Sequence, residues 1–143
     1  MLQVYCDGSA HERRGLPGGW AFALVERDVL RFAGSGAVPA TTNNEVELRA
    51  AISGLKEVVA RRLHAKARVE LISDSRMTLD VAQGVEAPAV HAVLGAELRA
   101  LALETRAVAI WVRGHSGNRW NEHVDAIAHR AKLTLVPLRK QSH

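Results

Sequence analysis

The chain has 143 residues and a mass of 15.5 kDa, which is the size of one ordinary domain. Apolar residues make up 48% and charged residues 24%, a balance that excludes disordered and collagen-like proteins. Aromatic residues are only 4%, so we expect a core built from Ala, Val, Leu and Ile. The formal charge of +4 favours a polyanionic partner without requiring one.

The cysteine content and the apolar runs bear on location. Cys6 is the single cysteine, so no internal disulfide can form and nothing points to an oxidising compartment. The apolar opening before Asp7 is too short for a secretion signal, and no later apolar run is long enough to cross a membrane. We therefore expect a cytoplasmic protein with no membrane partner, and a monomer by default.

The N-terminal part of the chain predicts three short strands and then a helix. Residues 2–6, 18–25 and 29–34 are rich in β-forming residues and are separated by turn-forming residues. The sequence Thr-Thr-Asn-Asn at 41–44 supplies helix-capping side chains. Apolar residues then recur at helical spacing from Leu48 onward, which predicts the clearest helix of the chain.

The rest of the chain alternates between strand and helix patterns. The expected elements are a strand over 68–72, a short helix to about residue 82, a helix over 89–105, a strand over 107–112, a loop over 113–118, and a helix over 120–133. We expect one domain over residues 1–133, followed by a flexible basic tail over 134–143.

This element order predicts an α/β fold. Three strands in a meander are antiparallel, whereas strands joined through helices are parallel, so the sheet is expected to be mixed. With right-handed crossovers, the strands ending at Ser9, Ser73 and Arg113 lie parallel and adjacent. Their carboxyl ends then share one edge of the sheet, where ligands bind in open α/β sheets.

Acidic residues occur where this edge is expected. Asp7 and Asp74 each follow an apolar run in an Asp-x-Ser sequence, Glu47 lies at the margin of the apolar stripe of the first helix, and Asp125 lies in the last helix. Each residue has an ordinary alternative role. Asp7 and Asp74 could each cap the following turn or helix. Glu47 could interact favourably with the dipole of its helix, and Asp125 could face solvent. Capping is a weaker explanation for Asp7 and Asp74 together, because both follow a predicted strand in the same way.

Converging carboxylates imply a metal site. Four such groups repel one another unless cations neutralise them, and hard oxygen donors suit Mg²⁺ or Mn²⁺ better than Zn²⁺. Two such ions about 3.5 to 4 Å apart can activate water and stabilise the leaving oxygen of a phosphodiester. No zinc-binding, Walker or dinucleotide motif competes for this role, and the strand setting of Cys6 favours a buried packing role.

Several motifs together resemble the type 1 ribonuclease H family. They occur in family order and span nearly the whole chain: YCDGS at 5–9, PGGW at 17–20, TTNNEVEL at 41–48, SDS at 73–75, WVRGHSG at 111–117 and NEHVD at 121–125. The combination of TTNNxxEL with a distant GHxGxxxNExxD is far more specific than any one of these motifs.

The resemblance implies a ribonuclease H-like fold, with a five-stranded mixed sheet flanked by helices. It also implies two-metal hydrolysis of the RNA strand of RNA/DNA hybrids, giving 5′-phosphate and 3′-hydroxyl ends. By this resemblance Asp7, Glu47, Asp74 and Asp125 bind two Mg²⁺ ions, with Mn²⁺ as a substitute. His115 then assists proton transfer and product departure, a role that suits an unperturbed pKa near 6.5.

The same resemblance assigns the substrate contacts. The 2′-hydroxyl marks RNA, and Gly8, Ser9, Asn43 and Asn44 are expected to line the minor groove of the hybrid, although both Asn side chains could instead cap the helix. Thr42 matches a residue that holds a phosphate of the DNA strand. The full set of expected substrate-binding residues is Gly8, Ser9, Thr42, Asn43, Asn44, Arg76 and Asn121.

The chain departs from the family pattern in its binding residues. The family's well-studied bacterial enzymes carry a basic protrusion where residues 84–88 here make a direct connection, so grip on the hybrid has to come from elsewhere. Glu45 adds negative charge where a basic residue often assists phosphate binding, and Arg76 replaces a common Gln. We expect the remaining histidines to lie at the surface.

Two other functions fit the same fold. One is a catalytically weak module that binds nucleic acid or a protein, and retention of four costly like charges argues against it. The other is a related integrase-like or exonuclease-like enzyme, which explains neither TTNN at 41–44 nor GHSGN at 114–118.

Overall fold

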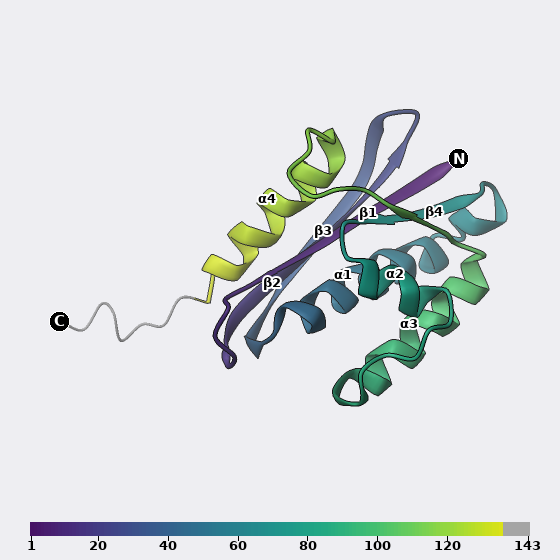
Figure 1. The fold of residues 1–143 in the computed structure, drawn as a ribbon. Coiled ribbons are helices and arrows are strands. Elements are labelled where there is room, and N and C mark those ends of the chain that lie inside the picture. The colour runs from purple at the N-terminus through teal and green to yellow at the C-terminus, as the bar shows by residue number, and fades with distance from the viewer. Residues whose placement is uncertain (136–143) are drawn as a thin grey trace.

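The computed structural model describes residues 1–135 and contains five strands, four α-helices and two short 3₁₀ turns (Figure 1). The elements are β1 (Leu2–Ala10), β2 (Leu16–Glu26), β3 (Val29–Thr41), α1 (Asn43–Ala60), η1 (Leu63–Ala65), β4 (Val69–Ser73), α2 (Arg76–Ala82), η2 (Ala89–His91), α3 (Ala92–Thr105), β5 (Val108–Trp111) and α4 (Arg119–Leu133).

The sheet is mixed and has the strand order β3-β2-β1-β4-β5. Strands β1, β2 and β3 pair antiparallel, whereas β4 pairs parallel with β1 and β5 pairs parallel with β4. The expected α/β fold, with a three-stranded meander and two added parallel strands, is confirmed. The carboxyl ends of β1, β4 and β5 therefore lie side by side.

Helices cover both faces of the sheet. Helix α4 packs on one face, and α1, with α2 and α3 beyond it, covers the other (Figure 1). Successive β2 residues point to opposite faces, so Ala21 and Ala23 join the apolar cluster under α4, whereas Phe22 and Leu24 join the larger cluster under α1. The low aromatic content thus coincides with a core made mainly of Ala, Val and Leu, as expected.

Several strands and helices have different ends from those expected. Strand β1 continues to Ala10, so Asp7 lies within a strand and pairs with Ala21 instead of following the strand in a turn. The parallel partner β4 pairs only as far as Tyr5, and the antiparallel partner β2 extends β1 beyond that point. Strand β3 likewise continues to Thr41, paired with β2. The expected helix over 89–105 begins as a 3₁₀ turn and becomes α-helical at Ala92.

The last element of the described chain is α4. Helix α4 ends at Leu133, as expected, whereas residues 136–143 of the predicted tail lie outside the described residues. Among the described residues, no helix has both the length and the apolar character needed to cross a membrane.

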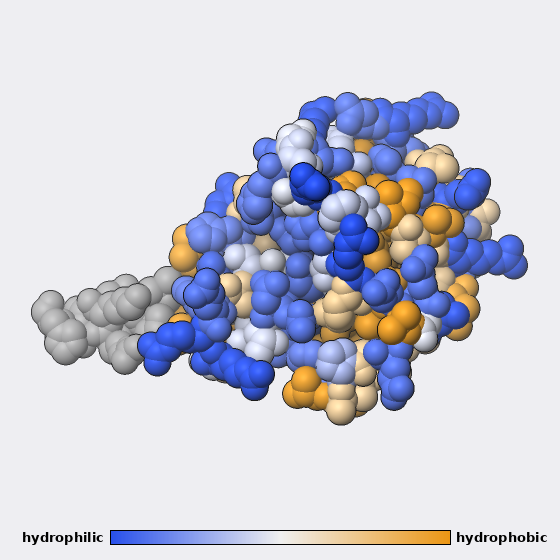
Figure 2. Space-filling model, in the orientation of Figure 1, coloured by the Kyte–Doolittle hydropathy of each residue, from blue (hydrophilic) through white to orange (hydrophobic). Residues whose placement is uncertain are grey.

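The surface seen in Figure 2 is largely hydrophilic. Apolar side chains gather on the side where β4, α2 and α3 lie (Figure 2). Val93 and Leu103 of α3 are among the exposed large apolar residues.

Gly19 of β2 tests how closely α4 packs on the sheet. A Cβ at this position would overlap the backbone of Ala128 and Lys132 in α4. Because both obstacles are main-chain atoms, Gly19→Ala is expected to displace α4 and to lower the free energy of unfolding by about 1 to 3 kcal/mol in urea titrations. Ser35→Ala, at an exposed position of β3, serves as the control, and equal stability of the two variants would contradict this packing.

Candidate active site

Three acidic side chains from three elements converge at the expected edge of the sheet. Asp7 lies in β1, Glu47 lies in the second turn of α1, and Asp74 follows β4 directly. One carboxylate oxygen from each lies within 4.8 Å of the others. Asp7 and Glu47 are buried, with 3% and 6% of their surface exposed, and Asp74 is half-buried. The structure therefore brings together three of the four predicted metal ligands.

A close approach between β1 and α1 holds Glu47 in place. The backbone N–H of Gly8 donates a hydrogen bond of 2.6 Å to Oε1 of Glu47. A Cβ at Gly8 would lie 2.6 Å from the backbone nitrogen of Glu47 and 2.7 Å from the carbonyl carbon of Val46. Only glycine at this position lets the helix come so near, so Gly8 positions a carboxylate in addition to any contact with substrate.

Asp74 keeps its carboxylate free because a neighbour caps the next helix. Ser75 is the N-cap of α2, and its hydroxyl accepts a hydrogen bond from the backbone N–H of Thr78. The alternative in which Asp74 caps this helix is therefore wrong. The indole N–H of Trp111 donates to the carbonyl oxygen of Asp74 at 3.1 Å, which ties the end of β5 to the site. Sequence patterns gave no signal for this contact.

Asp125 approaches the cluster from the opposite side of the sheet. It is half-buried in α4, and α4 packs against β1 and β2. Burial is the main cause that raises the pKa of Asp7 to about 10, and the charge of Glu47 and hydrogen bonding with Asp125 raise it further. Asp125 is therefore adjacent to Asp7 and does not simply face solvent.

The carboxylates raise one another's pKa values. Burial raises the pKa of Glu47 to about 8, and the charge of Asp74 adds to this, whereas hydrogen bonds from Asp7 and Gly8 oppose it. Burial also raises the pKa of the neighbouring Cys6 thiol, with the charges of Glu47 and Asp7 contributing. A buried thiol with a raised pKa is a poor nucleophile, which agrees with the packing role expected for Cys6.

The donor set fits a divalent cation. Oδ2 of Asp7 is buried and has no hydrogen-bond partner among the described residues, so a lone pair is left for another ligand. Hard carboxylate oxygens within 4.8 Å of one another match the ligands that Mg²⁺ and Mn²⁺ take in proteins. A bound cation would remove the repulsion that raises these pKa values.

The loop after β5 passes beside Asp74. A Cβ at Gly114 would lie 2.8 Å from Oδ2 of Asp74, so the loop backbone packs directly on the carboxylate. His115 is the next residue; it is exposed and has a left-handed backbone with φ of 54°. The loop therefore presents a titratable side chain next to the acidic cluster, where it remains accessible to a ligand.

The predicted substrate residues at the start of α1 form one wall of a groove. Thr42 is the N-cap, and its hydroxyl accepts a hydrogen bond from the backbone N–H of Glu45. Asn43 and Asn44 therefore do not cap the helix, and both side chains are exposed. The groove has a volume of about 430 Å³, and its lining residues are His11, Glu12, Arg14, Thr42, Asn43, Asn44, Pro88, Val90 and His91.

Neighbouring side chains offset the negative charge of Glu45. Its Oε1 accepts a hydrogen bond from the Thr41 hydroxyl, and its Oε2 accepts one from Nε of Arg49, both at 2.8 Å. Burial alone would raise the pKa of Glu45, but the hydrogen bonds from Thr41 and Arg49 and the charge of Arg49 lower it. The spacing of Glu45 and Arg49 by four positions is a sequence signal for this pair, and our sequence analysis missed it.

The remaining predicted residues differ in exposure. Arg76 is exposed, with its guanidinium 3.9 Å from the centre of the Trp111 ring, and Ser9 is half-buried in β1. Asn121 is 2% exposed, and its Nδ2 has no partner among the described residues. His91 is buried, so its expected surface location is wrong: it ends the 3₁₀ turn before α3 and lines the groove with little of its surface exposed.

Comparisons with known proteins agree with this geometry. The RNase H family model matches residues 1–132. The ribonuclease H of Anaeromyxobacter sp. (strain K) is 36% identical, over 90% of this chain and 78% of that protein. Two solved structures share the fold. The N-terminal RNase H domain of a Mycobacterium tuberculosis protein has a TM-score of 0.76 at 23% identity and covers 94% of each chain. LC11-RNase H1, in a structure with an RNA/DNA hybrid, has a TM-score of 0.72 at 22% identity and covers 92% of this chain and 99% of that one.

The mixed sheet with acidic groups at its carboxyl edge defines a domain with the ribonuclease H-like fold. The chain belongs to the RNase H family of enzymes, as the sequence motifs predicted. This family depends on divalent metal, and the acidic cluster supplies suitable ligands.

The raised pKa values predict how metal-free protein responds to pH. Between pH 4 and pH 8 the folded protein retains protons on Asp7 and Glu47 that the unfolded chain has released, so its free energy of unfolding falls as pH rises. Asp7→Asn should remove much of this fall and raise the Tm at pH 8 in EDTA by about 3 to 8 °C. Asp80→Asn, at an exposed position, should leave the pH dependence unchanged. A wild-type Tm that is flat across this range would contradict the raised pKa values.

Proposed function

We propose that this chain is a metal-dependent endoribonuclease that cuts the RNA strand of RNA/DNA hybrids and leaves 5′-phosphate and 3′-hydroxyl ends. The observation that carries the proposal is the convergence of Asp7, Glu47 and Asp74 beside the exposed residues Asn43 and Asn44. A structural neighbour of similar fold is described in complex with an RNA/DNA hybrid, which supports the choice of substrate.

The carboxylates Asp7, Glu47, Asp74 and Asp125 would hold two Mg²⁺ ions, and Mn²⁺ would substitute for them. Bound metal of this kind lowers the pKa of a water nucleophile and stabilises the leaving oxygen of a phosphodiester. Asp7 and Glu47 provide buried oxygens, whereas the half-buried Asp74 and Asp125 lie nearer to solvent. The more exposed pair is thus better placed to face the scissile phosphate.

Other residues of the chain would bind and orient the hybrid. Asn43 and Asn44 carry amide groups that can donate to and accept from a ribose 2′-hydroxyl and the base edges of the minor groove. The Gly8 N–H keeps Glu47 turned toward the site, where this carboxylate can also accept a hydrogen bond from a 2′-hydroxyl. DNA lacks that hydroxyl, so these contacts favour an RNA strand at the cleavage site.

The groove that includes Thr42 would hold the DNA strand. Arg14 and His11 line the same groove as Thr42 and add donors for phosphate oxygens. The pairing of Glu45 with Arg49 limits repulsion of phosphate at this end of α1. Arg76, which is exposed two residues after Asp74 and stacks on Trp111, would add a further cation, and Ser9 and Asn121 complete the proposed contacts.

His115 would move protons. It follows Gly114, which packs on Asp74, and its exposed imidazole can take a proton from the attacking water or give one to the departing 3′-oxygen. We further propose that the protein acts as a monomer in the cytoplasm.

Cleavage of a labelled hybrid tests the activity and its ligands. Asp74→Asn should lower kcat by at least about 100-fold because it removes one charged oxygen ligand, whereas Asp80→Asn should cut as the wild type does. Duplex DNA and single-stranded RNA should remain intact in parallel reactions. A hybrid that remains uncut in both Mg²⁺ and Mn²⁺ would contradict the enzyme proposal and favour a module that only binds nucleic acid or a protein.

The role of His115 predicts a change in turnover rather than in binding. His115→Ala should lower kcat by about 100-fold, the usual contribution of a positioned general acid or base, with KM nearly unchanged. The matched variant His129→Ala alters an exposed histidine of α4 and should have no effect. Loss of affinity without loss of kcat would assign His115 to substrate binding instead.

A further inference from the structure

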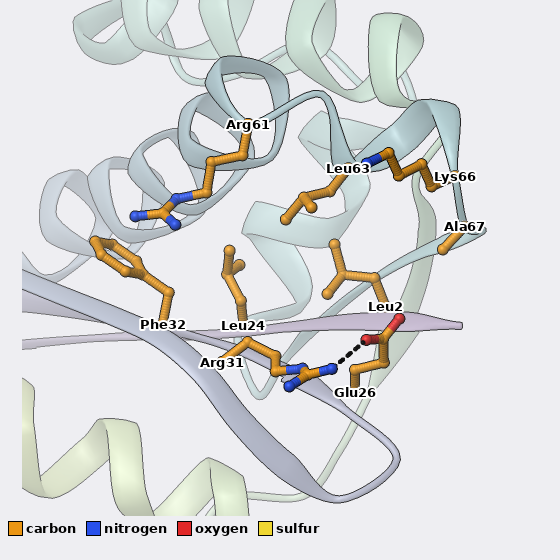
Figure 3. A pocket seen from close by; sticks show the side chains of 9 residues that line it. All are labelled: Leu2, Leu24, Glu26, Arg31, Phe32, Arg61, Leu63, Lys66 and Ala67. Atoms are coloured by element: carbon orange, nitrogen blue, oxygen red, sulfur yellow. Dashed lines mark hydrogen bonds and ion pairs between the residues drawn. The ribbon is translucent and has the colours of Figure 1, made fainter.

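A second pocket lies at the far end of the sheet from the acidic cluster. It has a volume of about 310 Å³ and lies between the C-terminal end of α1 and the strands β1, β2 and β3 (Figure 3). Its lining residues are Leu2, Leu24, Glu26, Arg31, Phe32, Arg61, Leu63, Lys66 and Ala67. Helix α1 has 18 residues and so separates this pocket from Asn43 by about 27 Å, which places it outside the proposed active site.

The pocket combines an apolar floor with a cationic rim. Leu2, Leu24, Leu63, Ala67 and Phe32 form the floor, and the side chains of Arg31, Arg61 and Lys66 stand around it (Figure 3). A single carboxylate, Glu26, lines the pocket, and Arg31 pairs with it at 3.3 Å. Arg61 pairs with Glu57 at 2.7 Å, so Lys66 is the rim cation left without an ion pair among the described residues. Leu2 and Leu24 are buried at the base of the floor, whereas Phe32, Leu63 and Ala67 are half-buried and reach the pocket surface.

Two of the three cations have unused hydrogen-bonding capacity. Arg61 donates to Glu57 through Nε at 2.7 Å, and its terminal nitrogens make no hydrogen bond within residues 1–135. Lys66 makes no ion pair with any described residue. Both side chains are exposed, so an anionic group arriving from solvent can reach them without breaking an existing ion pair.

We propose that this pocket docks an acidic peptide segment of another protein, with one aromatic or aliphatic side chain on the floor and flanking carboxylates on the rim. An apolar floor gains free energy only from an apolar group that covers it, and carboxylates complement the rim charge. Both requirements are met by a peptide in which acidic residues flank a bulky apolar one.

Nucleic acid fits the pocket less well. Phosphates would satisfy the rim, but they would leave the apolar floor in contact with water or ions. A base would need to stack on the Phe32 ring, whose centre already lies 4.0 Å from the guanidinium of Arg61. An apolar peptide side chain needs no ring to stack on and can pack on the aliphatic side chains of Leu63 and Ala67. The last eight residues of the chain carry Arg139 and Lys140 and no acidic side chain, so their charge does not complement the rim either.

Fluorescence anisotropy with short labelled peptides tests the proposal. An amidated peptide Asp-Asp-Phe-Asp-Asp should bind saturably to the full-length protein. Replacing its Phe by Ala should weaken binding about tenfold, and replacing its Asp residues by Lys should abolish it. No saturable binding, or equal binding of the Phe and Ala peptides, would overturn the proposal.

Variants of the rim locate the binding. Lys66→Glu should weaken binding of the Phe peptide about fivefold or more, whereas Arg130→Glu makes the same charge change at an exposed position of α4 and should not. Both variants should keep wild-type circular dichroism and hybrid cleavage. Equal affinities of the two variants would place the peptide elsewhere and overturn the assignment.

Methyl NMR distinguishes a peptide site from a nucleic-acid site. The Phe peptide should shift the methyl signals of Leu2, Leu24 and Leu63, which lie on the floor. An oligothymidylate of equal charge should leave them unchanged. Shifts caused by the oligonucleotide and not by the peptide would make the pocket a nucleic-acid surface and end the peptide proposal. The binding assay needs no catalysis, so its outcome is independent of the proposed nuclease function.

Discussion

The repulsion among the acidic side chains at the edge of the sheet is the constraint on which much of the surrounding structure depends. Asp7 and Glu47 are buried within 4.8 Å of each other and of Asp74, an arrangement that raises the pKa of Asp7 to about 10 and of Glu47 to about 8. Such a cluster persists only if the backbone holds its members in place. The Gly8 contact with α1, the Ser75 cap and the Trp111 indole all do so, and a bound divalent cation would supply the missing charge.

The same contacts leave side chains free for substrate. Thr42 and Ser75 cap α1 and α2, so neither the Asn side chains of α1 nor the carboxylate of Asp74 is used for capping. Glu45, which would otherwise repel phosphate, is bound by Thr41 and Arg49. Arg14 lines the groove with Thr42, and Arg76 follows Asp74 by two positions, so basic side chains that attract phosphate lie near the proposed substrate contacts even though residues 84–88 form no basic protrusion.

Much of the fold followed from the sequence because its periodicities are strong. The run of β-forming residues in β2 and the apolar stripe from Leu48 to Val58 in α1 indicated these two elements, and the strand–helix alternation indicated the parallel strands. The ends of elements were less predictable. Asp7 falls within β1 because antiparallel pairing with β2 extends past the parallel pairing with β4, and pairing between distant strands leaves no local pattern.

The sequence by itself determined the class of the protein: the motifs around Asp7, Glu47, Asp74 and Asp125 resemble those of the ribonuclease H family, and the family model that matches residues 1–132 confirms this prediction. Only the tertiary structure decided how these groups are held. The 2.6 Å hydrogen bond from Gly8 to Glu47, the packing of Gly114 on Asp74 and the apolar pocket beyond α1 each join residues far apart in the chain. Their geometry depends on how helices pack on the sheet, which no local pattern encodes.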